Sequence, residues 1–455
     1  MSQHTDVLVI GMGPGGEHIA GRLAEAGLHV TGVEAELVGG ECPYWGCVPS
    51  KMMIRAGNLL AEARRVAGLA GYADVTPDWG PVAARIRDEA TDDWNDQVAV
   101  DRFTSRGGHF VRGRGRLTGP RQVEVDGETY RARRGIVVAT GTRPAVPPVP
   151  GLKDVPYWTN RDAVATKDPP ATLIVLGGGA IGLELAQVFA RFGTRVTVVE
   201  ALGRLLPMEE PESGGLIADV LRSEGLDVRT GARVTAVRHD HDAFTTALDG
   251  GAELTAQRLL VATGRHADLS GLGLDTVGLD PHARALETDG YLRAADGLWA
   301  VGDVTGRGAF THVAMYQAEI AVRDILGEDG PAADYRALPH VTFTDPEIAS
   351  VGLTEARARE CGLRVRTGLA RVPSSARGWI HKAGNDGLIK LVEDADGGVL
   401  VGATAAGPAG GEVLYGLAVA IQGRMPVTAL RHMIYAYPTF HRGVQDALAD
   451  LDHGR

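Results

Sequence analysis

The sequence predicts an α/β protein in which two parallel-sheet units are followed by a C-terminal α+β domain. Two observations carry this prediction. A strand-like run, a glycine-rich turn, an apolar-periodic helix and a second strand occur within residues 7–34 and again within residues 173–200. After residue 334 the pattern changes to strand-like alternation, followed by apolar helices at 411–422 and 426–433. Continuous apolar runs indicate buried parallel strands, whereas alternation indicates strands with one exposed face.

The first glycine-rich turn has the spacing Gly-x-Gly-x-x-Gly, at Gly11, Gly13 and Gly16. It lies between the apolar run 7–10 and a helical pattern, and the next strand ends in Glu34. Glycines at this spacing let the backbone approach a pyrophosphate at a helix N-terminus, and an acid about 20 residues further on accepts a ribose hydroxyl. The whole unit therefore predicts a Rossmann-like dinucleotide site.

The second unit repeats this arrangement with Gly177, Gly179, Gly182 and Glu200. Both units are also followed by a strand that ends in Ala-Thr-Gly, at 139–141 and 262–264. Agreement in order and spacing indicates an internal repeat. A carboxylate at the ribose 2′ position accepts a hydroxyl but repels a phosphate, so a nicotinamide dinucleotide bound here would be NAD(H) rather than NADP(H).

Three further stretches organise the chain. The proline-rich segment 144–151 predicts a stiff linker and a domain boundary. From Met52 to about Val100 the pattern is helical, with a break near 71–80. The apolar run 298–301 ends in Gly-Asp at Asp303, and the carboxyl end of a parallel strand is where ligands bind, although a plain turn aspartate is the alternative.

Composition restricts the class of partner. The 455-residue chain has a formal net charge of −11 and no basic run, which argues against nucleic acid. Its apolar runs are too short to span a membrane, and its N-terminus has no charged-then-apolar signal region. Its three cysteines fit a reducing cytoplasm, where a bonded pair is more often catalytic than structural. We therefore expect a soluble cytoplasmic protein without a metal site.

Two of the cysteines, Cys42 and Cys47, lie in the segment 39–51. In a regular helix the Cα atoms of residues i and i+5 are about 8–9 Å apart, whereas a disulfide tolerates at most about 7 Å. If the pair bonds, the segment is therefore not regular helix, and Pro43 and Gly46 can supply the turn. Two unrelated buried thiols are the alternative, because this spacing is neither a metal nor a thioredoxin-type motif.

The chain resembles the flavoprotein disulfide reductases, the family of dihydrolipoamide dehydrogenase, glutathione reductase and mercuric reductase. The resemblance covers essentially the whole chain and rests on Gly-Gly-x-Cys-x4-Cys-x-Pro-Ser-Lys, both glycine-rich turns, both Ala-Thr-Gly turns, Val-Gly-Asp and Thr-Asp-Pro-Glu-Ile-Ala-Ser-Val-Gly. It implies a glutathione-reductase-like fold and a homodimer. The implied domains are an FAD-binding domain at 1–148 and 268–335, an NAD-binding domain at 149–267 and an interface domain at 336–455.

The resemblance also implies site roles. Cys47 would face the flavin as a thiolate, Cys42 would attack the substrate, and Lys51 would lie near the flavin and pair with Glu184. The cofactors implied are FAD and NAD(H). The residues expected to bind them are Gly11, Gly13, Gly16, Glu34, Gly40, Lys51, Gly115, Gly141, Asp303, Ala314, Gly177, Gly179, Gly182, Glu200 and Gly264.

The C-terminus departs from the family pattern. The family has His-Pro-Thr-x-x-Glu there, contributed across the dimer interface, and this chain has Tyr437 and Arg442 at the histidine and glutamate positions. An imidazole with a pKa of about 6.5 shuttles protons at neutral pH, whereas a phenol with a pKa of about 10 does not. His441 is a candidate substitute. Mercuric reductases supply extra cysteines near the tail, and this chain has none after Cys361, which we interpret as structural.

Three hypotheses remain open at this point. The first is an NADH-dependent flavoenzyme whose acceptor is a quinone, a metal ion or a specialised sulfur compound. The second is a disulfide reductase of the dihydrolipoamide dehydrogenase type with Tyr437 or His441 as substitute base. The third is a redox sensor or partner subunit that keeps FAD for structure, which the intact dithiol disfavours. The bulky Tyr44 and Trp45 between the cysteines are interpreted as packing residues.

Overall fold

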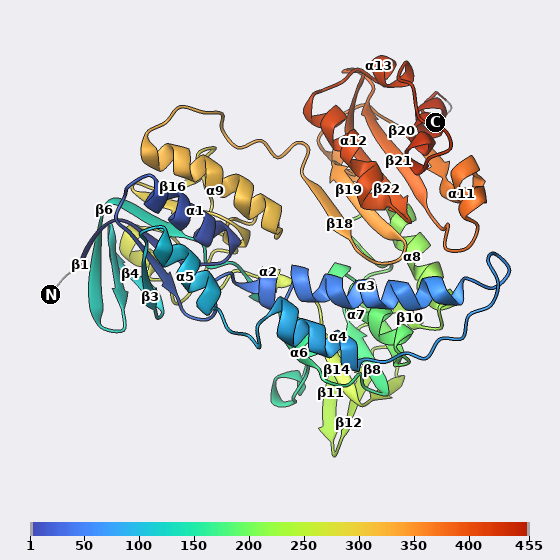
Figure 1. The fold of residues 1–455 in the computed structure, drawn as a ribbon, viewed down its shortest axis with the longest axis horizontal. Coiled ribbons are helices and arrows are strands. Elements are labelled where there is room, and N and C mark those ends of the chain that lie inside the picture. The colour runs from blue at the N-terminus through green and yellow to red at the C-terminus, as the bar shows by residue number, and fades with distance from the viewer. Residues whose placement is uncertain (1–2, 453–455) are drawn as a thin grey trace. The chain divides into compact units, whose positions relative to one another are not determined.

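The computed structural model describes residues 3–452, so the outermost residues of the predicted first and last domains, 1–2 and 453–455, lie outside it (Figure 1). The described chain divides into two compact units. The first unit comprises the segments up to residue 50, 83–145 and 264–334, and the second comprises 51–82, 146–263 and the segment from residue 335 onward. The division into four domains stays a prediction.

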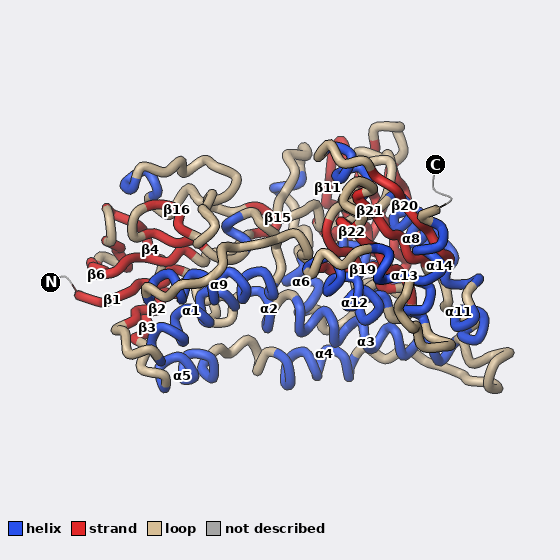
Figure 2. The backbone as a smooth tube through the Cα atoms, turned by 90° about the horizontal axis from the view of Figure 1, so that it is seen from above, coloured by secondary structure: helices blue, strands red, loops and turns tan. Residues whose placement is uncertain are grey.

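The first unit contains a mostly parallel sheet in the order β16-β17-β6-β1-β2-β3, extended by the hairpin strands β4 and β5. Its centre is the apolar run of β1, in which Val7 and Val9 pack with α1 and α9, while Leu8 and Ile10 pack into a second core on the other face. Successive side chains of a strand point to opposite faces, so a strand buried on both faces is continuously apolar. Figure 2 shows α1 and α9 side by side, joined by an ion pair of 2.6 Å between Arg22 and Glu319.

The elements of the first unit are as follows. Its strands are β1 (Gln3–Ile10), β2 (Val30–Glu34), β3 (His109–Arg112), β4 (Gly115–Gly119), β5 (Gln122–Val125), β6 (Glu128–Val138), β16 (Arg293–Ala295), β17 (Leu298–Ala300) and the separate pair β7 (Arg143–Pro144) and β15 (Arg265–His266). Its helices are α1 (Pro14–Glu25), α2 (Glu41–Tyr44), α5 (Gln97–Ser105) and α9 (Thr311–Leu326), and α3 (Cys47–Arg64) and α4 (Gly80–Arg85) cross from one unit to the other along the chain.

The second unit contains a four-stranded parallel sheet in the order β10-β9-β8-β14 and a five-stranded antiparallel sheet in the order β18-β19-β22-β21-β20. Its strands are β8 (Thr172–Leu176), β9 (Arg195–Glu200), β10 (Asp227–Thr230), β11 (Val234–Asp240), β12 (Ala243–Leu248), β13 (Glu253–Ala256), β14 (Arg258–Val261), β18 (Pro339–Thr342), β19 (Glu347–Gly352), β20 (Val365–Arg371), β21 (Leu388–Asp394) and β22 (Val399–Gly407). Its helices are α6 (Asn160–Ala165), α7 (Ala180–Arg191), α8 (Pro211–Ser223), α10 (Glu355–Glu360), α11 (Ala376–His381), α12 (Gly410–Gln422), α13 (Val427–Arg431) and α14 (Gly443–Asp450).

The predicted helical stretch from Met52 to about Val100 needs correction at both ends. Helix α3 already begins at Cys47, and the break is longer than expected, because α3 ends at Arg64 and α4 begins at Gly80. Residues Ile86–Ala90 form a π-helix, and residues 92–94 all have left-handed backbone conformations before α5 begins. The turn at 92–94 has no apolar periodicity, and the helical pattern on either side of it led to the prediction of a continuous helix there.

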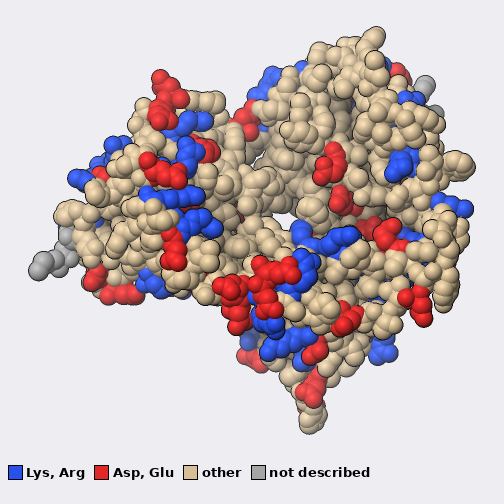
Figure 3. All heavy atoms as spheres, viewed as in Figure 1, with Lys and Arg blue, Asp and Glu red and all other residues tan. Residues whose placement is uncertain are grey.

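Acidic and basic side chains are interspersed on the face of the molecule drawn in Figure 3. Over residues 3–452, no helix has both the length and the apolar content needed to cross a membrane.

Candidate active site

The first glycine-rich turn connects β1 to α1 and is packed too tightly for side chains. A Cβ atom at Gly16 would overlap the carbonyl oxygen of Gly11, whereas a Cβ atom at Gly13 would meet nothing within 4 Å. Gly13 therefore faces open space beside the N-terminus of a helix, as a pyrophosphate requires. Glu34, at the end of β2, accepts hydrogen bonds from the backbone N–H groups of Met12, at 2.7 Å, and Glu36, at 2.8 Å. Burial raises the pKa of the Glu34 carboxyl.

The second turn connects β8 to α7 and repeats this geometry. A Cβ atom at Gly182 would overlap the carbonyl oxygen of Gly177, and one at Gly179 would again meet nothing within 4 Å. Glu200, at the end of β9, accepts from the N–H groups of Gly178 and Leu202, both at 2.7 Å. The two turns that share a glycine spacing in the sequence thus also share a geometry in the structure. Each has an open backbone face and an acid, as a dinucleotide site needs.

The two cysteines lie on either side of a break between helices. Helix α2 ends at Tyr44, and α3 begins at Cys47, so the segment is not one regular helix. Cys42 is partly buried and Cys47 is exposed. The Cys47 Sγ atom lies 3.4 Å from the hydroxyl of Thr311, the first residue of α9. The segment 39–51 that carries both cysteines is called the redox loop. Its first residue contacts the first glycine-rich turn, because the Gly39 N–H donates to the Met12 carbonyl oxygen at 2.7 Å.

Asp303 lies just after β17 in a polar cluster of the first unit. Its carboxylate accepts a hydrogen bond of 2.9 Å from the Thr142 hydroxyl. Arg265 in turn donates to the Thr142 hydroxyl at 2.9 Å and lies 3.5 Å from the Glu41 carboxylate. Burial raises the pKa of Asp303, which a ligand that donates hydroxyl hydrogen bonds would offset.

In the second unit, Lys51 of α3 forms an ion pair of 2.9 Å with Glu184 of α7. Glu184 is 6% exposed, and its other oxygen accepts from the Phe343 N–H at 2.8 Å. The Lys51 ammonium also lies 4.7 Å from the centre of the Phe343 ring. Two contacts with Phe343, one to each partner, therefore hold this ion pair in one arrangement.

The C-terminal candidates lie in and just before a short turn. The Tyr437 side chain is 68% exposed, and the guanidinium of Arg442 lies 5.3 Å from the centre of its ring. Arg442 also donates to Gln445 at 2.9 Å. His441 is exposed, and its Nε2 atom lies 3.3 Å from the Thr439 hydroxyl.

The remaining predicted cofactor residues take varied positions. Gly40 packs against Gly13, since a Cβ atom on Gly40 would lie 2.9 Å from the Gly13 Cα atom. Ala314 of α9 lies beside Gly15 and Gly302. The others lie in the following places: Gly115 in β4 against Ile10, Gly141 in the loop after β6, and Gly264 next to the pair β7 and β15.

Sequence reasoning missed several residues of this region. Thr142 donates to Asp303 and Arg265 donates to Thr142; each directly follows an Ala-Thr-Gly turn, and that position was the available signal. The helical pattern predicts Trp94 within a helix, but its indole stacks on that of Trp45, between the two cysteines, with ring centroids 5.3 Å apart. The tryptophan itself was the available signal, since a large aromatic residue next to two aspartates is unusual on a solvated helix face.

Two dinucleotide turns and a dithiol next to the first define a class, namely proteins that transfer electrons between a nicotinamide nucleotide and a disulfide through a flavin. The chain belongs to the pyridine nucleotide-disulphide oxidoreductase family. Residues 5–318 match the family model, and residues 338–448 match its dimerisation domain. Members of this family are enzymes that bind FAD, use NAD(H) and carry a redox-active disulfide.

Similar proteins fall into two groups by name. Dihydrolipoyl dehydrogenase of Thermus scotoductus is 34% identical, over 98% of this chain and 97% of its own. Mercuric reductase of Acidithiobacillus ferrooxidans is 33% identical, over 97% of this chain and 82% of its own. Among solved structures, LpdA from Mycobacterium tuberculosis has a TM-score of 0.85, 26% identity and 99% coverage of both chains. The Cu(II) complex of the HOCl-induced flavoprotein disulfide reductase RclA from Escherichia coli has a TM-score of 0.86, 26% identity and 99% coverage of both chains.

The match to the dimerisation domain supports a homodimer. Apolar side chains are exposed on the C-terminal elements, among them Tyr415 at 73% and Val419 at 51% on α12, and Ile434 at 98%. Within residues 3–452, no group of three or more His, Cys, Asp or Glu side chains is placed to hold a metal ion.

Proposed function

We propose that this protein is an NADH-dependent flavoenzyme that reduces its Cys42–Cys47 disulfide and delivers the electrons to an acceptor other than an ordinary small disulfide. The observation that carries the proposal is the pair Tyr437 and Arg442. The phenol is exposed beneath a guanidinium, and neither group is a neutral-pH base. Without that base, thiol–disulfide exchange with lipoamide or glutathione disulfide loses about 10²–10⁴-fold in rate.

The residues present fit both cofactors. The turn at Gly11, Gly13 and Gly16 with Glu34 and Asp303 would hold FAD, which supplies two-electron transfer between a nicotinamide and a disulfide when it is bound. Further residues that we propose contact FAD or NAD(H) are Gly40, Lys51, Gly115, Gly141, Ala314 and Gly264. In each turn the open face at the central glycine and the acid at the strand end support this assignment.

The second turn, with Glu200, favours NADH. Both Glu200 oxygens accept hydrogen bonds from backbone N–H groups, which fixes the carboxylate and supports its proposed role as the acceptor for a ribose hydroxyl. The nearby cation, Arg204, donates to the carbonyl oxygens of Leu206, Pro207 and Glu209 at 3.1, 2.6 and 2.8 Å. A guanidinium occupied by its own loop does not form the bidentate pair with a 2′-phosphate that NADPH needs.

Reduction of the disulfide takes two electrons and two protons, of which the hydride of NADH supplies both electrons and one proton. NADH and one proton convert the disulfide to two thiols and release NAD⁺. Cys42 is then the thiol that attacks the acceptor, and Cys47, beside the Thr311 hydroxyl, stays with the flavin. By the family resemblance, the ammonium of Lys51 would lie near the flavin, and its ion pair with Glu184, whose other oxygen accepts from the Phe343 N–H, supports a fixed position for that ammonium.

A metal ion is the acceptor class to test first. The relatives include mercuric reductases, and RclA has been solved as a Cu(II) complex. Thiolates bind soft metal ions, so a reduced dithiol can present two ligands to a metal that arrives as substrate. Quinones and specialised sulfur compounds are the other candidates.

Rapid mixing of the FAD-loaded enzyme with NADH, followed by single acceptors, tests the proposal. We expect fast flavin reduction and slow reoxidation by lipoamide and glutathione disulfide, with faster reoxidation by Cu(II), Hg(II) or a quinone. Lipoamide turnover of tens per second, a usual enzymatic rate of about 10 s⁻¹ or more, would refute it. That result would favour the second candidate, a dihydrolipoyl dehydrogenase type with His441 as base.

The long-wavelength thiolate-to-flavin band tests the dithiol roles separately. Cys47→Ser abolishes this band if Cys47 is the flavin-side thiolate, and Cys42→Ser shows it without any reductant. A wild-type enzyme that lacks the band at every pH, oxidised and reduced, would contradict the dithiol assignment and favour a sensor or partner subunit.

A further inference from the structure

The loop 201–210, between β9 and α8, forms one wall of the second glycine-rich turn. The Leu206 N–H donates to the Gly178 carbonyl oxygen at 2.9 Å, and the Gly178 N–H donates to Glu200 at 2.7 Å. Leu202 donates to the other Glu200 oxygen at 2.7 Å. The position of this loop therefore determines where the ribose-binding carboxylate and the middle of the turn lie.

The loop does not hold this shape by backbone preference. Leu206 has a φ of 45°, in the left-handed region that a leucine rarely adopts. Arg204 bridges three carbonyl oxygens of the loop and keeps it compact. A non-glycine residue in this conformation persists only where surrounding contacts hold it.

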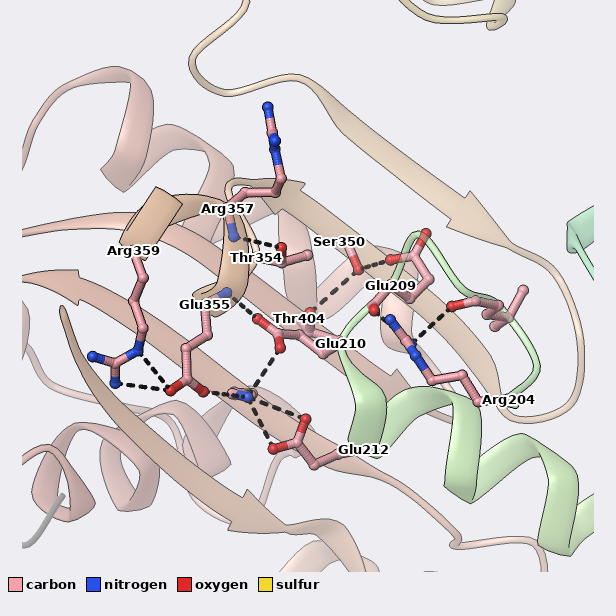
Figure 4. A network of polar contacts seen from close by, with 12 residues as sticks. Arg204, Glu209, Glu210, Glu212, Ser350, Thr354, Glu355, Arg357, Arg359 and Thr404 are labelled. Carbon is pink, nitrogen blue, oxygen red and sulfur yellow. Dashed lines mark hydrogen bonds and ion pairs between the residues drawn. The ribbon is translucent and has the colours of Figure 1, made fainter. Parts of the chain in front are cut away.

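The C-terminal end of the loop, at Glu209 and Glu210, forms polar contacts with residues after 335 in the second unit. Glu209 accepts from the Ser350 hydroxyl at 2.6 Å, and its other oxygen lies 2.7 Å from the His340 Nε2 atom. Figure 4 shows the Glu209 and Ser350 side chains directed at each other from the loop and from β19. Glu209 is 7% exposed, and Ser350 is 6% exposed, so water competes little for these contacts.

The next residue, Glu210, is held by a buried lysine. Lys390 of β21 lies 3.0 Å from Glu210, 2.9 Å from Glu212 and 2.9 Å from Glu355, so one ammonium contacts three carboxylates. Figure 4 shows these three glutamates converging from the start of α8 and from α10. Lys390 and Glu210 have side chains only 4% and 3% exposed. Removal of the ammonium leaves the buried carboxylate of Glu210 without its cation and close to two partly exposed carboxylates of like charge.

We infer that Lys390 is a positioning residue for the nicotinamide-dinucleotide site, acting through Glu210 and the loop 201–210. Its ammonium contacts carboxylates of the protein, and its effect on the site passes through them. It holds the end of the loop, the loop holds Gly178 and Glu200, and these two receive the nucleotide. This inference rests on the proposed binding of NADH at the second turn and adds that the C-terminal domain, besides its role in dimerisation, sets the affinity of that turn.

Lys390→Met in the FAD-loaded enzyme tests the inference, with Lys167→Met, on an exposed lysine of the same unit, as the matched control. We expect the dissociation constant for NAD⁺, measured by calorimetry, to rise about tenfold, which is about 1.4 kcal/mol. Amide hydrogen exchange at Gly178, Leu202 and Leu206 should accelerate in parallel. KM for NADH should rise while kcat changes little, and FAD content should stay that of the wild type.

Ser350→Ala is the second variant, because it removes one hydroxyl from Glu209 without leaving a charge unpaired. We expect about a threefold weaker NAD⁺ affinity and faster exchange at Leu206. If Lys390→Met does not fold, this variant decides the question. Unchanged NAD⁺ affinity in a folded variant whose loop exchanges faster would overturn the inference alone. A wild-type enzyme that binds no NAD⁺ would instead overturn the proposed function.

Discussion

The indole of Trp45 stacks on that of Trp94, with ring centroids 5.3 Å apart and planes inclined by 23°. Trp45 lies between Cys42 and Cys47, whereas Trp94 ends a turn in which residues 92–94 have φ values of 48°, 52° and 58°. Left-handed conformations cost L-residues about 1–2 kcal/mol each. The stack therefore joins the redox loop to a strained turn that its own sequence does not favour, and each segment restrains the other.

Removal of this stack should loosen the redox loop. An aromatic pair contributes about 0.5–1.5 kcal/mol beyond burial, so Trp94→Ala should increase transient opening of the loop about 2–12-fold. The measurement is the rate at which iodoacetamide alkylates Cys42 in the NADH-reduced enzyme. Trp379→Ala, on a tryptophan that is 77% exposed, is the control. Equal alkylation rates in both variants and the wild type would show that the stack does not restrain the loop.

Nucleotide preference should depend on the charge of Glu200. We expect kcat/KM with NADH to exceed that with NADPH by at least about tenfold, because a carboxylate close to a phosphate costs more than about 1.4 kcal/mol. Glu200→Gln keeps the shape, removes the charge and should reduce this ratio. Glu328→Gln, at an exposed position of the first unit, should leave it unchanged. Equal wild-type rates with both nucleotides would contradict the assignment.

A base restored at the C-terminus should raise disulfide turnover. The double variant Tyr437→His, Arg442→Glu should speed reoxidation of the NADH-reduced enzyme by lipoamide at least about tenfold, because an imidazole can accept the Cys42 proton near pH 7. Flavin reduction by NADH should not change. Arg442→Glu alone supplies no imidazole and serves as the control. If the double variant folds and reoxidation stays slow, the missing base is not what limits the reaction.

The pH dependence of stability should report on Glu209. Burial opposes its ionisation, but the contacts with His340 and Ser350 outweigh burial and hold the pKa of Glu209 below its ordinary value of 4.5. The folded state thus binds fewer protons than the unfolded state at this site, so its contribution is complete above pH 4.5 and is lost as the pH falls through the folded pKa. The free energy of unfolding of the wild type minus that of Glu209→Gln should therefore shrink as the pH falls below 4.5 and through the folded pKa of Glu209. A difference that grows on acidification would contradict the shift.

The exposed apolar face of α12 should form part of the dimer interface. Tyr415 and Val419 are one helical turn apart and exposed by 73% and 51%. Tyr415→Asp with Val419→Asp should place two charges in a desolvated contact and shift the protein toward the monomer at micromolar concentration in sedimentation experiments. Tyr72→Asp, at a site 86% exposed in another loop, is the control. A double variant that remains fully dimeric would place the interface elsewhere.

The sequence by itself determined the parts that depend on short spacing. Both dinucleotide turns, with Glu34 and Glu200, could be predicted because glycine spacing, apolar runs and the acid at the strand end are local properties of about 30 residues. The break between Cys42 and Cys47 followed from the sequence only for a bonded pair, because a regular helix holds residues at that spacing too far apart for a disulfide; the structure has the break, and the pairing stays a prediction.

Only the tertiary structure decided which distant residues meet. Trp94 reaches Trp45 through a left-handed turn that no periodicity marks, and Lys390 finds its carboxylates on segments far from it in the chain. Such contacts depend on how separate elements pack, and packing is set by the summed burial of many side chains rather than by any residue spacing. No local pattern of the sequence therefore predicts the contacts between the loop 201–210 and the C-terminal domain.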